Sequence, residues 1–386
     1  MQKSYSTRVL IITSHFAPAY KAGGIVRSLE NLVRCFDSEF KFYVLTGNTD
    51  LNSQEKLNEV TPDTWTCYTG NCNVMYLSEA KRKFGNLKEI FEFIKPDVVY
   101  INGLYSIPFT IFPLWILKEV MSETLMILAP WGMLHRGNLA MKPLKKRIFL
   151  ALFKILGFHK NVRWHATDLQ EKLDVMQLFG PKSQVVLADA VPRLNTCSLQ
   201  PIAKSSDHLK LITVSLITPN KGHLRLLRAL KELQNEISVE YHIYGPIKDD
   251  KFWKVCQQEI KTLSSSIEVH YHGFIDPATV TASLLQCHFF VLPTQGENFC
   301  QAIHESLLAG RPVIISDQTP WKKLQEQQAG WEIDLQDKNA LPNALKMAYH
   351  MDQVTYDGYC KGAQAVAHRC LDRSRLRDQY QRLFVR

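Results

Sequence analysis

Short apolar runs rich in valine and isoleucine alternate with amphipathic stretches along the chain. Between the runs, stretches such as Gly24–Cys35 and Leu87–Ile94 are typical of helices. In the first half, the runs predict strands at Arg8–Thr13, Lys41–Thr46, Asn73–Leu77, Asp97–Ile101, Leu125–Ala129, Val162–Ala166 and Gln184–Leu187. Short strands separated by helices indicate a parallel sheet whose two faces are both covered.

The pattern stops at Pro192–His208, a polar stretch without periodicity that we interpret as a linker, and then restarts. Helices are predicted at Lys221–Leu233 and Phe299–Ala309. Strands are predicted at Leu209–Ser215, Val239–Tyr244, Glu268–His272, His288–Leu292 and Val313–Ser316. The two series predict an α/β protein with two doubly wound, Rossmann-like domains that face a cleft, with ligands at the carboxyl ends of the strands.

The predicted organisation is an N-terminal domain over residues 1–191, a linker over 192–208, a C-terminal domain over 209–370 and a final helical segment over 371–386. A chain of 386 residues is long for one core, which supports two domains. The composition, 46% hydrophobic and 22% charged residues, is that of a globular protein. Because the nine cysteines are scattered without a Cys-x-x-Cys pair, we expect reduced thiols, with no disulfide framework or zinc site.

The first residues, Met1–Ser6, lead into a strand without an apolar signal segment, and no apolar stretch reaches the ~18 residues of a membrane span. A cytosolic location is therefore expected. The net charge of +9 is concentrated locally, because residues 124–167 contain no Asp or Glu. The same stretch contains eight cations: Arg136, Lys142, Lys145, Lys146, Arg147, Lys154, Lys160 and Arg163.

Within this stretch, Met141–Lys160 has an apolar centre at Ile148–Phe158, which is too short to span a bilayer. The basic residues at its entry are Lys142, Lys145, Lys146 and Arg147. Two interpretations are open: an interfacial helix on anionic lipid, or a core helix with a basic rim. Nucleic acid is not predicted as a partner, because the run lacks aromatics placed for base stacking and no nucleic-acid motif is present.

The most informative spacing is that of Glu297 and Glu305, which follow a predicted buried strand and enter a predicted helix. Helical rise over eight residues would separate them by ~12 Å along the axis. The N–H groups of the first helical turn between them would favour an anion, so one ligand held at two points would fit. The alternative is a capping Glu297 and a solvated or paired Glu305. A glycosidase carboxylate pair fits poorly, since those lie roughly 5–9.5 Å apart.

Residues 285–321 resemble the donor-site signature of the family-4 retaining glycosyltransferases, which have the GT-B fold, in the pattern Glu-x7-Glu. The resemblance covers nearly the whole chain and is most specific over 210–345. It implies that residues 1–191 form the acceptor-side domain, that residues 209–370 form the nucleotide-sugar donor domain, and that the final helix packs back on the N-terminal domain. It implies that Glu297 contacts the transferred sugar and Glu305 the ribose hydroxyls of the nucleotide. Segment 316–322 resembles a variant common in bacterial polysaccharide-assembly transferases. The other donor-binding residues implied are Asn298, Phe299, Cys300, Thr319, Gly273 and Phe274.

Lys221 lies in Ser215–His223, which resembles the family's Gly-Arg-Leu-x-x-x-Lys-Gly motif. The resemblance implies that Lys221 binds the donor diphosphate, and a cation there would stabilise the departing charge. The chain departs from the motif at Leu216, where the family has an arginine. Arg225 and Arg228 on the following helix are candidates to replace that cation.

Two loops of the first domain resemble family loops near the donor and acceptor. The paired glycines Gly23 and Gly24 at a helix start permit close approach of backbone to a ligand. The second loop has Trp131 where many relatives have a histidine that faces the donor sugar. Trp131 stacking on a sugar and Trp131 packing in the core are both open, and His135 is a candidate for a polar role.

The sequence therefore predicts a metal-independent, retaining glycosyltransferase of the hexosyltransferase type, cytosolic or peripheral on the inner face of the membrane. No cofactor is predicted, and no Asp-x-Asp, His-x3-His or His-Glu-x-x-His spacing indicates a metal site. The predicted partners are a nucleoside-diphosphate-sugar donor, a glycan or polyprenyl-linked acceptor and an anionic membrane surface, in surface polysaccharide, O-antigen or capsule synthesis. Two alternatives are a sugar-nucleotide epimerase of the same fold and a non-catalytic nucleotide-sugar-binding scaffold.

Overall fold

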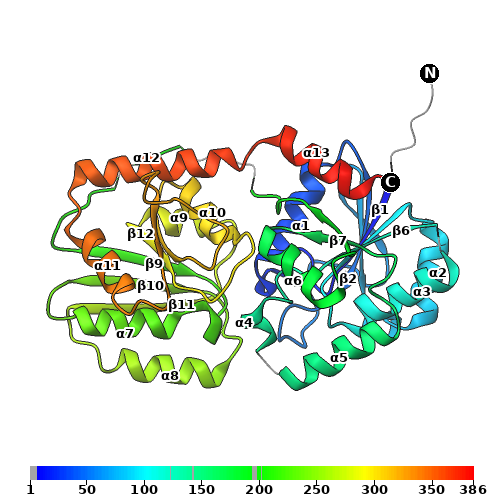
Figure 1. Cartoon of the computed structure of the whole chain (residues 1–386), viewed down its shortest axis with the longest axis horizontal. Helices are drawn as coiled ribbons and strands as arrows, with labels where there is room; N and C mark the ends of the chain where they lie inside the picture. The colour runs from blue at the N-terminus through cyan, green and yellow to red at the C-terminus, as the bar shows by residue number, and fades with distance from the viewer. Residues whose placement is uncertain (1–6, 122, 141–142, 194–197, 201) are drawn as a thin grey trace. The chain divides into compact units, whose positions relative to one another are not determined.

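The structure is a computed structural model that describes residues 7–121, 123–140, 143–193, 198–200 and 202–386. The chain forms two compact units (Figure 1). Unit 1 comprises Met1–Val191 together with Arg373–Arg386, and unit 2 comprises Pro192–Asp372. Each unit is an α/β layer structure around its own sheet, as the alternating sequence pattern predicts.

The described part of unit 1 contains an eight-stranded sheet in the order β3-β4-β2-β1-β5-β6-β7-β8. All neighbours pair in parallel except β3, which is antiparallel to β4. Its strands are β1 (Arg8–Ile12), β2 (Lys41–Gly47), β3 (Trp65–Thr69), β4 (Cys72–Leu77), β5 (Val98–Asn102), β6 (Leu125–Ala129), β7 (Arg163–Ala166) and β8 (Gln184–Leu187).

Helices cover both faces of this sheet, and the alternation of side chains along β1 separates the two layers. Val9 and Ile11 pack with α1 and α13, whereas Leu10 and Ile12 pack with α2, α3 and α5. The helices are α1 (Gly24–Cys35), α2 (Phe84–Ile94), α3 (Phe112–Val120), α4 (Arg136–Leu139), α5 (Pro143–Ile155), α6 (Leu169–Phe179) and α13 (Arg373–Phe384). Short helical turns occupy Tyr20–Ala22, Glu79–Lys81 and Ile107–Ile111.

The terminal helix α13 (red in Figure 1) packs on the first unit beside α1. The ring of Tyr380 lies 5.1 Å from that of Phe36, and Phe384 contacts Phe40 and Tyr100 at 5.3 and 5.6 Å. Arg163 donates to the carbonyls at the end of the helix, which suits a cation at the negative end of the dipole. Aromatic packing and this cap hold the chain terminus on the sheet.

The described part of unit 2 contains a six-stranded parallel sheet in the order β11-β10-β9-β12-β13-β14. Its strands are β9 (Leu209–Val214), β10 (Val239–Tyr244), β11 (Ile267–Gly273), β12 (Phe289–Leu292), β13 (Val313–Ser316) and β14 (Gly330–Ile333). Its helices are α7 (His223–Leu233), α8 (Asp250–Ile260), α9 (Val280–Leu285), α10 (Gln301–Leu308), α11 (Ala340–His350) and α12 (Gln353–Arg369), with a short turn at Pro219–Lys221.

Strand β9 again separates the layers, because Leu211 packs with α7, α8 and α11 and Ile212 packs with α9, α10 and α12. The described residues of the predicted linker, 192–193, 198–200 and 202–208, form no helix or strand and belong to unit 2. Arg311 is 1% exposed and donates to the carbonyls of Gln200 and Leu285. Lys204 donates through its Nζ to the carbonyl of Tyr349 at 2.8 Å.

The structure confirms the predicted fold class of two doubly wound α/β domains. Sequence analysis did not identify β3 or β14, and it placed the start of α10 two residues early. The described cysteines form no disulfide, and no described helix is both long and apolar enough to cross a membrane.

Candidate functional site

Three neighbouring strands of unit 2 end at the same edge of the sheet. The loops that follow these strands contain predicted donor-site residues. Strand β12 lies between β9 and β13. The loop after β9 contains Lys221, the loop after β12 contains Glu297, and the loop after β13 contains Thr319. The parallel order therefore brings three segments distant in sequence to the place where ligands bind in this fold class.

Gly222 fixes how closely the first two loops approach. Its φ of +82° lies in the left-handed region, and a Cβ there would meet the carbonyl oxygen of Pro293 at 2.2 Å. Gln295 donates from its backbone N–H to the carbonyl of Asn220 at 2.8 Å, which joins the two loops directly. Only glycine allows Lys221 to sit this close to the loop after β12.

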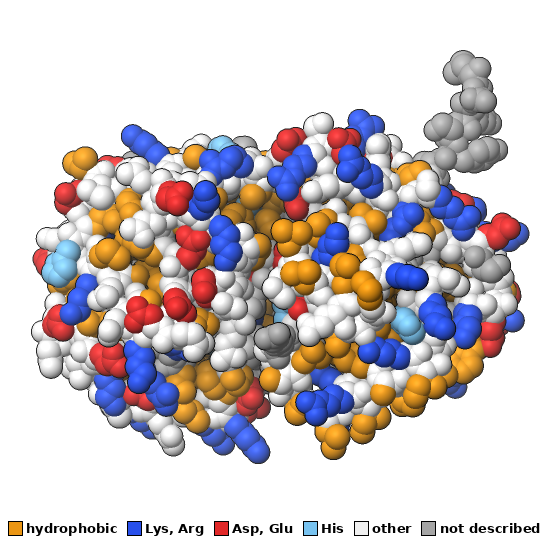
Figure 2. All heavy atoms as spheres, viewed as in Figure 1, with side chains coloured by type: hydrophobic (Ala, Val, Ile, Leu, Met, Phe, Trp, Pro, Cys, Tyr) orange, Lys and Arg blue, Asp and Glu red, His pale blue; other side chains and the backbone are white. Residues whose placement is uncertain are grey.

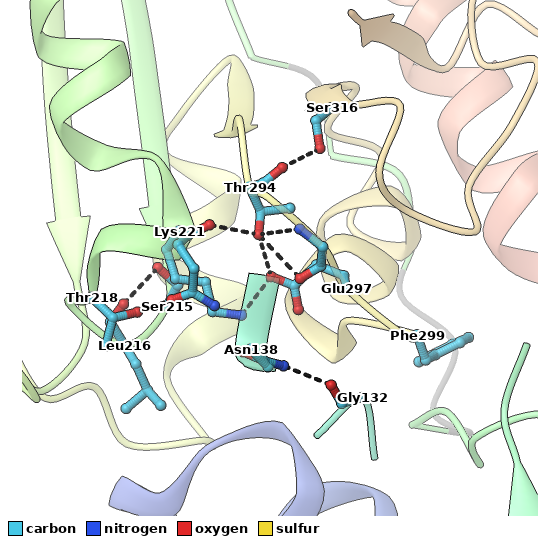
Figure 3. A network of polar contacts seen from close by, with 12 residues as sticks. Gly132, Asn138, Ser215, Leu216, Thr218, Lys221, Thr294, Glu297, Phe299 and Ser316 are labelled. Carbon is cyan, nitrogen blue, oxygen red and sulfur yellow. Dashed lines mark hydrogen bonds and ion pairs between the residues drawn. The ribbon is translucent and has the colours of Figure 1, made fainter. Parts of the chain in front are cut away.

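Lys221 and Glu297 form an ion pair in which Nζ lies 2.5 Å from Oε1 (Figure 3). Their side chains are 18% and 10% exposed. The hydroxyl of Thr294 donates to the same Oε1 at 3.0 Å, and the hydroxyl of Ser316 donates to the carbonyl of Thr294 at 2.6 Å. The backbone N–H of Glu297 also donates to the carbonyl of Gln318. These contacts fix the carboxylate in one orientation.

Burial disfavours the charged form of Lys221, but the Glu297 carboxylate outweighs that effect, so the pKa of Lys221 is raised. The amine therefore stays a cation throughout the physiological pH range. Burial next to Glu297 raises the pKa of the Cys300 thiol to about 12, so this cysteine is neutral. The site thus contains one fixed cation and one fixed carboxylate, with no thiolate at neutral pH.

Helix α10 begins at Gln301, immediately after Cys300, whose φ of +57° ends the helical path. Glu297 therefore lies in the loop before the helix, and Glu305 lies in its second turn and is 3% exposed. The predicted separation of ~12 Å between Glu297 and Glu305 assumed a continuous helix. That assumption is wrong, because residues 297–300 do not follow helical rise. The first turn contains no acidic residue, and the Cys300 side chain makes no capping hydrogen bond. The positive end of the α10 dipole thus faces the loop that contains Glu297.

The remaining predicted donor residues flank this loop. The ring of Phe299 packs against Trp321 at 5.3 Å, and its carbonyl accepts from the Trp321 indole N–H at 2.6 Å. Asn298, like Phe299, is half-buried. Thr319 is 4% exposed, and its hydroxyl has no hydrogen-bond partner among the described residues. A buried hydroxyl of this kind is a potential donor to a ligand.

Gly273 ends β11 with a φ of +75°, and its carbonyl accepts from the backbone N–H of Gly245 at 2.7 Å. The next side chain, Phe274, is 41% exposed. This pair lies two strands away from β9, on the edge strand β11.

The two cations proposed to replace the family arginine at Leu216 have other partners. Arg225 donates to the carbonyl of Leu335 at 2.8 Å, and Arg228 pairs with Glu259 of α8 at 3.6 Å. Both lie on the outward side of α7, because the inward positions of that helix are taken by leucines. Both arginines are thus engaged elsewhere in this structure, and the hypothesis that one of them takes the place of the family arginine stays a prediction.

In unit 1, Gly23 and Gly24 lie at the start of α1, as predicted. Gly23 is the N-cap residue with a φ of +91°, and it has no side chain to cap the helix. The first turn of α1 contains no acidic residue. The positive end of a second helix dipole therefore faces the loop after β1.

The loop after β6 is held by two acids of α6. Glu171, which is fully buried, accepts from the backbone N–H of Gly132 at 2.6 Å. Asp174 pairs with His135, with Oδ2 2.5 Å from Nδ1. The indole N–H of Trp131 donates to Asn102 Oδ1 at 2.8 Å. Trp131 therefore packs within the first unit while it remains half-buried, and the proposed polar role of His135 stays a prediction.

Electrostatics in this loop favour a charged His135. Burial lowers its pKa, but the hydrogen bond and the charge of Asp174 outweigh burial, so the pKa of His135 is raised. Burial raises the pKa of Glu171, although the N–H groups of Gly132 and Thr167 oppose that shift. The loop is thus a polar, anchored segment at the carboxyl end of β6.

Four residues of these networks were not predicted from the sequence: Thr294, Ser316, Glu171 and Asp174. Thr294 could have been identified from its place directly after the buried strand, next to the Glu297 loop. Glu171 and Asp174 gave no signal, because two acids three residues apart are ordinary on an exposed helix face. Only the fold shows that they point to the loop after β6.

The four predicted membrane cations differ in position. Lys145 and Arg147 are exposed on α5, and Lys142 lies outside the described residues. Lys146 is half-buried, donates to the carbonyl of Asn138 and lies 5.5 Å from the ring of Tyr105. Over the described residues, no group of three or more His, Cys, Asp or Glu is placed to bind a metal ion.

Comparisons of the sequence and the structure with known proteins identify the fold. Residues 208–350 match the family model described as Glycosyl transferases group 1. The whole chain is similar to the structure of sucrose-phosphate synthase from Thermosynechococcus elongatus, with a TM-score of 0.73 over 98% of this chain and 99% of that chain at 15% identity. The chain has the GT-B fold.

Two other structures with the GT-B fold support the assignment. HepE of Anabaena in complex with UDP and glucose has a TM-score of 0.69 at 15% identity, over 98% of this chain and 99% of that chain. WaaG, a glycosyltransferase involved in lipopolysaccharide biosynthesis, has a TM-score of 0.65 at 12% identity, over 98% and 99%. No curated protein matches the sequence. These similarities establish the GT-B architecture, and the family match covers most of the unit that contains Lys221 and Glu297.

Proposed function

We propose that this protein is a glycosyltransferase that moves a sugar from a nucleoside-diphosphate-sugar to a glycan or lipid-linked saccharide. One observation carries the proposal: the ion pair of Lys221 and Glu297 lies beside the positive end of α10 within the region that matches the glycosyl transferases group 1 model. A fixed cation and a helix N-terminus together suit a diphosphate, and a fixed carboxylate suits the hydroxyls of a sugar.

Charge stabilisation accounts for most of the chemistry in this proposal. As the bond between the sugar and the diphosphate breaks, negative charge builds up on the leaving diphosphate. Lys221 and the first turn of α10 would stabilise that charge without reorganisation, because the surrounding loop already holds them in place. Glu297 would orient the sugar, and Glu305 would bind the ribose. We propose transfer of a hexose with retention of configuration and without a metal, since Lys221 supplies the positive charge.

The similarity to HepE, whose complex contains UDP and glucose, supports a nucleotide-sugar donor. The similarity to WaaG supports a role in lipopolysaccharide or other surface polysaccharide synthesis. Such acceptors are often linked to lipid, so we also propose that the protein associates peripherally with a membrane. The exposed cations of α5, which include Lys145 and Arg147, support this association.

Nucleotide binding and turnover test the proposal separately. Wild-type protein and Glu305→Ala are heated with UDP, GDP, ADP or dTDP, with Glu326→Ala, an exposed residue of the same unit, as the control. A nucleotide at 100 times its Kd stabilises by about 2.7 kcal/mol, or about 5–10 °C for a unit of this size. We expect one nucleotide to shift wild type and Glu326→Ala but not Glu305→Ala. No shift with any nucleotide would refute donor binding.

A second candidate, a non-catalytic nucleotide-sugar binder, is favoured by Leu216 and by the engagement of Arg225 and Arg228 with other partners. Incubation with the stabilising nucleotide's sugar donors and with lipid-linked or free glycans decides between the two. Transfer that is lost in Lys221→Ala supports the enzyme. A thermal shift without any product supports the binder, and a changed nucleotide-sugar formed without an acceptor would indicate an epimerase.

A further inference from the structure

Helix α5 of unit 1 has two apolar faces, only one of which is covered. Its inward side chains Leu150 and Phe153 are 8% and 2% exposed and pack in the core of unit 1. The uncovered face consists of apolar side chains spaced three or four residues apart, which form one stripe along the helix. These are Leu144 at 70% exposed, Ile148 at 54%, Leu152 at 53% and Ile155 at 80%.

Unpaired cations flank this stripe. Lys145, Arg147, Lys154 and Lys160 are exposed, and within the described part of the chain none of them pairs with a carboxylate. Figure 2 shows apolar side chains with Lys and Arg among them along the lower right edge, over α5. Burial and the nearby charges of Lys160 and Lys154 lower the pKa of His159, a further sign of crowded positive charge.

A groove of about 510 Å³ continues from the C-terminal end of the stripe. Leu114, Leu117 and Phe158 contribute to its apolar floor. Its cations are Lys118, Lys160 and Arg386, and none of the residues that line it is acidic. Lys118 has a structural role as well, because it donates to the carbonyl of Leu156 beyond the end of α5. The volume and the mixed lining are those of a pocket for a small amphiphile.

We propose that this face of unit 1 docks on a bilayer of anionic phospholipid, with the α5 stripe inserted and one phospholipid bound in the groove. The lipid's phosphate would lie at Lys160 and Arg386, and its chains would lie on the apolar floor. An apolar stripe between cations matches the chemistry of an anionic lipid surface. A second copy of the chain fits poorly, since it would bring two unpaired basic faces together. A nucleic-acid partner would bind the cations but would leave the apolar stripe without a contact.

The inference deepens the peripheral association of the proposed function, yet its test needs no catalysis. Wild-type protein is sedimented with vesicles of phosphatidylglycerol or of phosphatidylcholine alone. We expect binding to the former, weakened by salt. Ile155→Glu should lower the bound fraction constant roughly tenfold or more, from lost apolar burial. Lys160→Glu should lower it about fivefold or more, from lost attraction. The matched controls Val354→Glu, at 83% exposure, and Lys361→Glu, both on α12, should bind like wild type.

Soluble dihexanoyl phosphatidylglycerol tests the groove itself. We expect it to raise the melting temperature of wild type, but not of Lys160→Glu, while glycerol phosphate and inorganic phosphate at equal concentration have no effect. An equal effect of the free phosphates would identify a phosphate site and overturn the lipid assignment. Three results would overturn the proposal that this face docks on anionic lipid. They are equal binding to both vesicle types, unchanged binding of Ile155→Glu, and a dimer in solution that Ile155→Glu abolishes. The nucleotide shift of unit 2 in the same variants shows independently whether the proposed function holds.

Discussion

Breaking the ion pair of Lys221 and Glu297 should destabilise unit 2 far more than breaking a surface pair. The two side chains are 18% and 10% exposed, so removal of either partner leaves a largely buried, uncompensated charge. Such losses cost about 3–5 kcal/mol for fully buried pairs, and we expect about 3 kcal/mol for this one. For a unit of about 180 residues, that corresponds to a fall of about 6–12 °C in melting temperature.

The assay is the melting temperature of the unit 2 transition for Lys221→Met, Glu297→Gln and the double variant. The double variant should recover part of the loss, because it leaves no unpaired charge. Lys346→Met is the matched control, since Lys346 pairs with Glu236 at 2.6 Å with side chains 38% and 53% exposed. An exposed pair of that kind contributes about 0.2–1 kcal/mol. Equal, small shifts for Lys221→Met and Lys346→Met would refute the argument.

The sign of the pH dependence gives a second check on the same pair. In wild type the pKa of Lys221 is raised, so its contribution is present at neutral pH and lost only as pH rises through that raised pKa. In Glu297→Gln, burial alone acts on the amine and lowers its pKa. Its penalty should then be largest at neutral pH and decrease as pH approaches 10, because the folded state can hold a neutral amine. A penalty independent of pH from 7 to 10 would show that Lys221 is solvated.

Three further outcomes are expected. Gly222→Ala should abolish the nucleotide-induced thermal shift and lower stability by about 3 kcal/mol, because its Cβ would overlap the Pro293 carbonyl and its φ is positive; an unchanged shift contradicts this. Asp174→Asn should destabilise unit 1 more at pH 5.5 than at pH 8.5 in thermal melts. The pKa of His135 is raised in the folded state, so its pairing with Asp174 adds stability at low pH, and this stability is lost as pH rises through the folded-state pKa. Phe384→Ala should cost about 3–5 kcal/mol in urea unfolding of unit 1, since the ring is 1% exposed; a cost below 1 kcal/mol would show that α13 is not docked.

The architecture could be predicted from sequence because buried parallel strands read as short apolar runs, and helices such as α1 keep their apolar period. Strand β3 was missed because it is a half-exposed antiparallel edge strand without a continuous apolar run. The start of α10 was misplaced because the φ of +57° at Cys300 is a tertiary feature. Local propensity does not reveal a left-handed cysteine.

The candidate site was predictable only where a residue type carries its own chemistry. Lys221 and Glu297 were identified separately, but their direct pairing depends on the approach of two loops that Gly222 permits. The anchoring of the β6 loop by Glu171 and Asp174 depends on where α6 lies against β7 and β8, which no local pattern encodes. Contacts across long sequence separations set the geometry that the chemistry requires.

The placement of α13 on unit 1 has a consequence for how the chain is made. Residues of unit 2 are synthesised between the sheet of unit 1 and the helix that completes it. At 5–20 residues per second, about 180 residues take roughly 10–40 s. During that time the nascent first unit exposes the aromatic surface at Phe36, Phe40 and Tyr100 that Tyr380 and Phe384 later cover. The first unit can therefore complete its core only after the whole second unit has been translated, and this aromatic surface is open to non-native contacts for that interval.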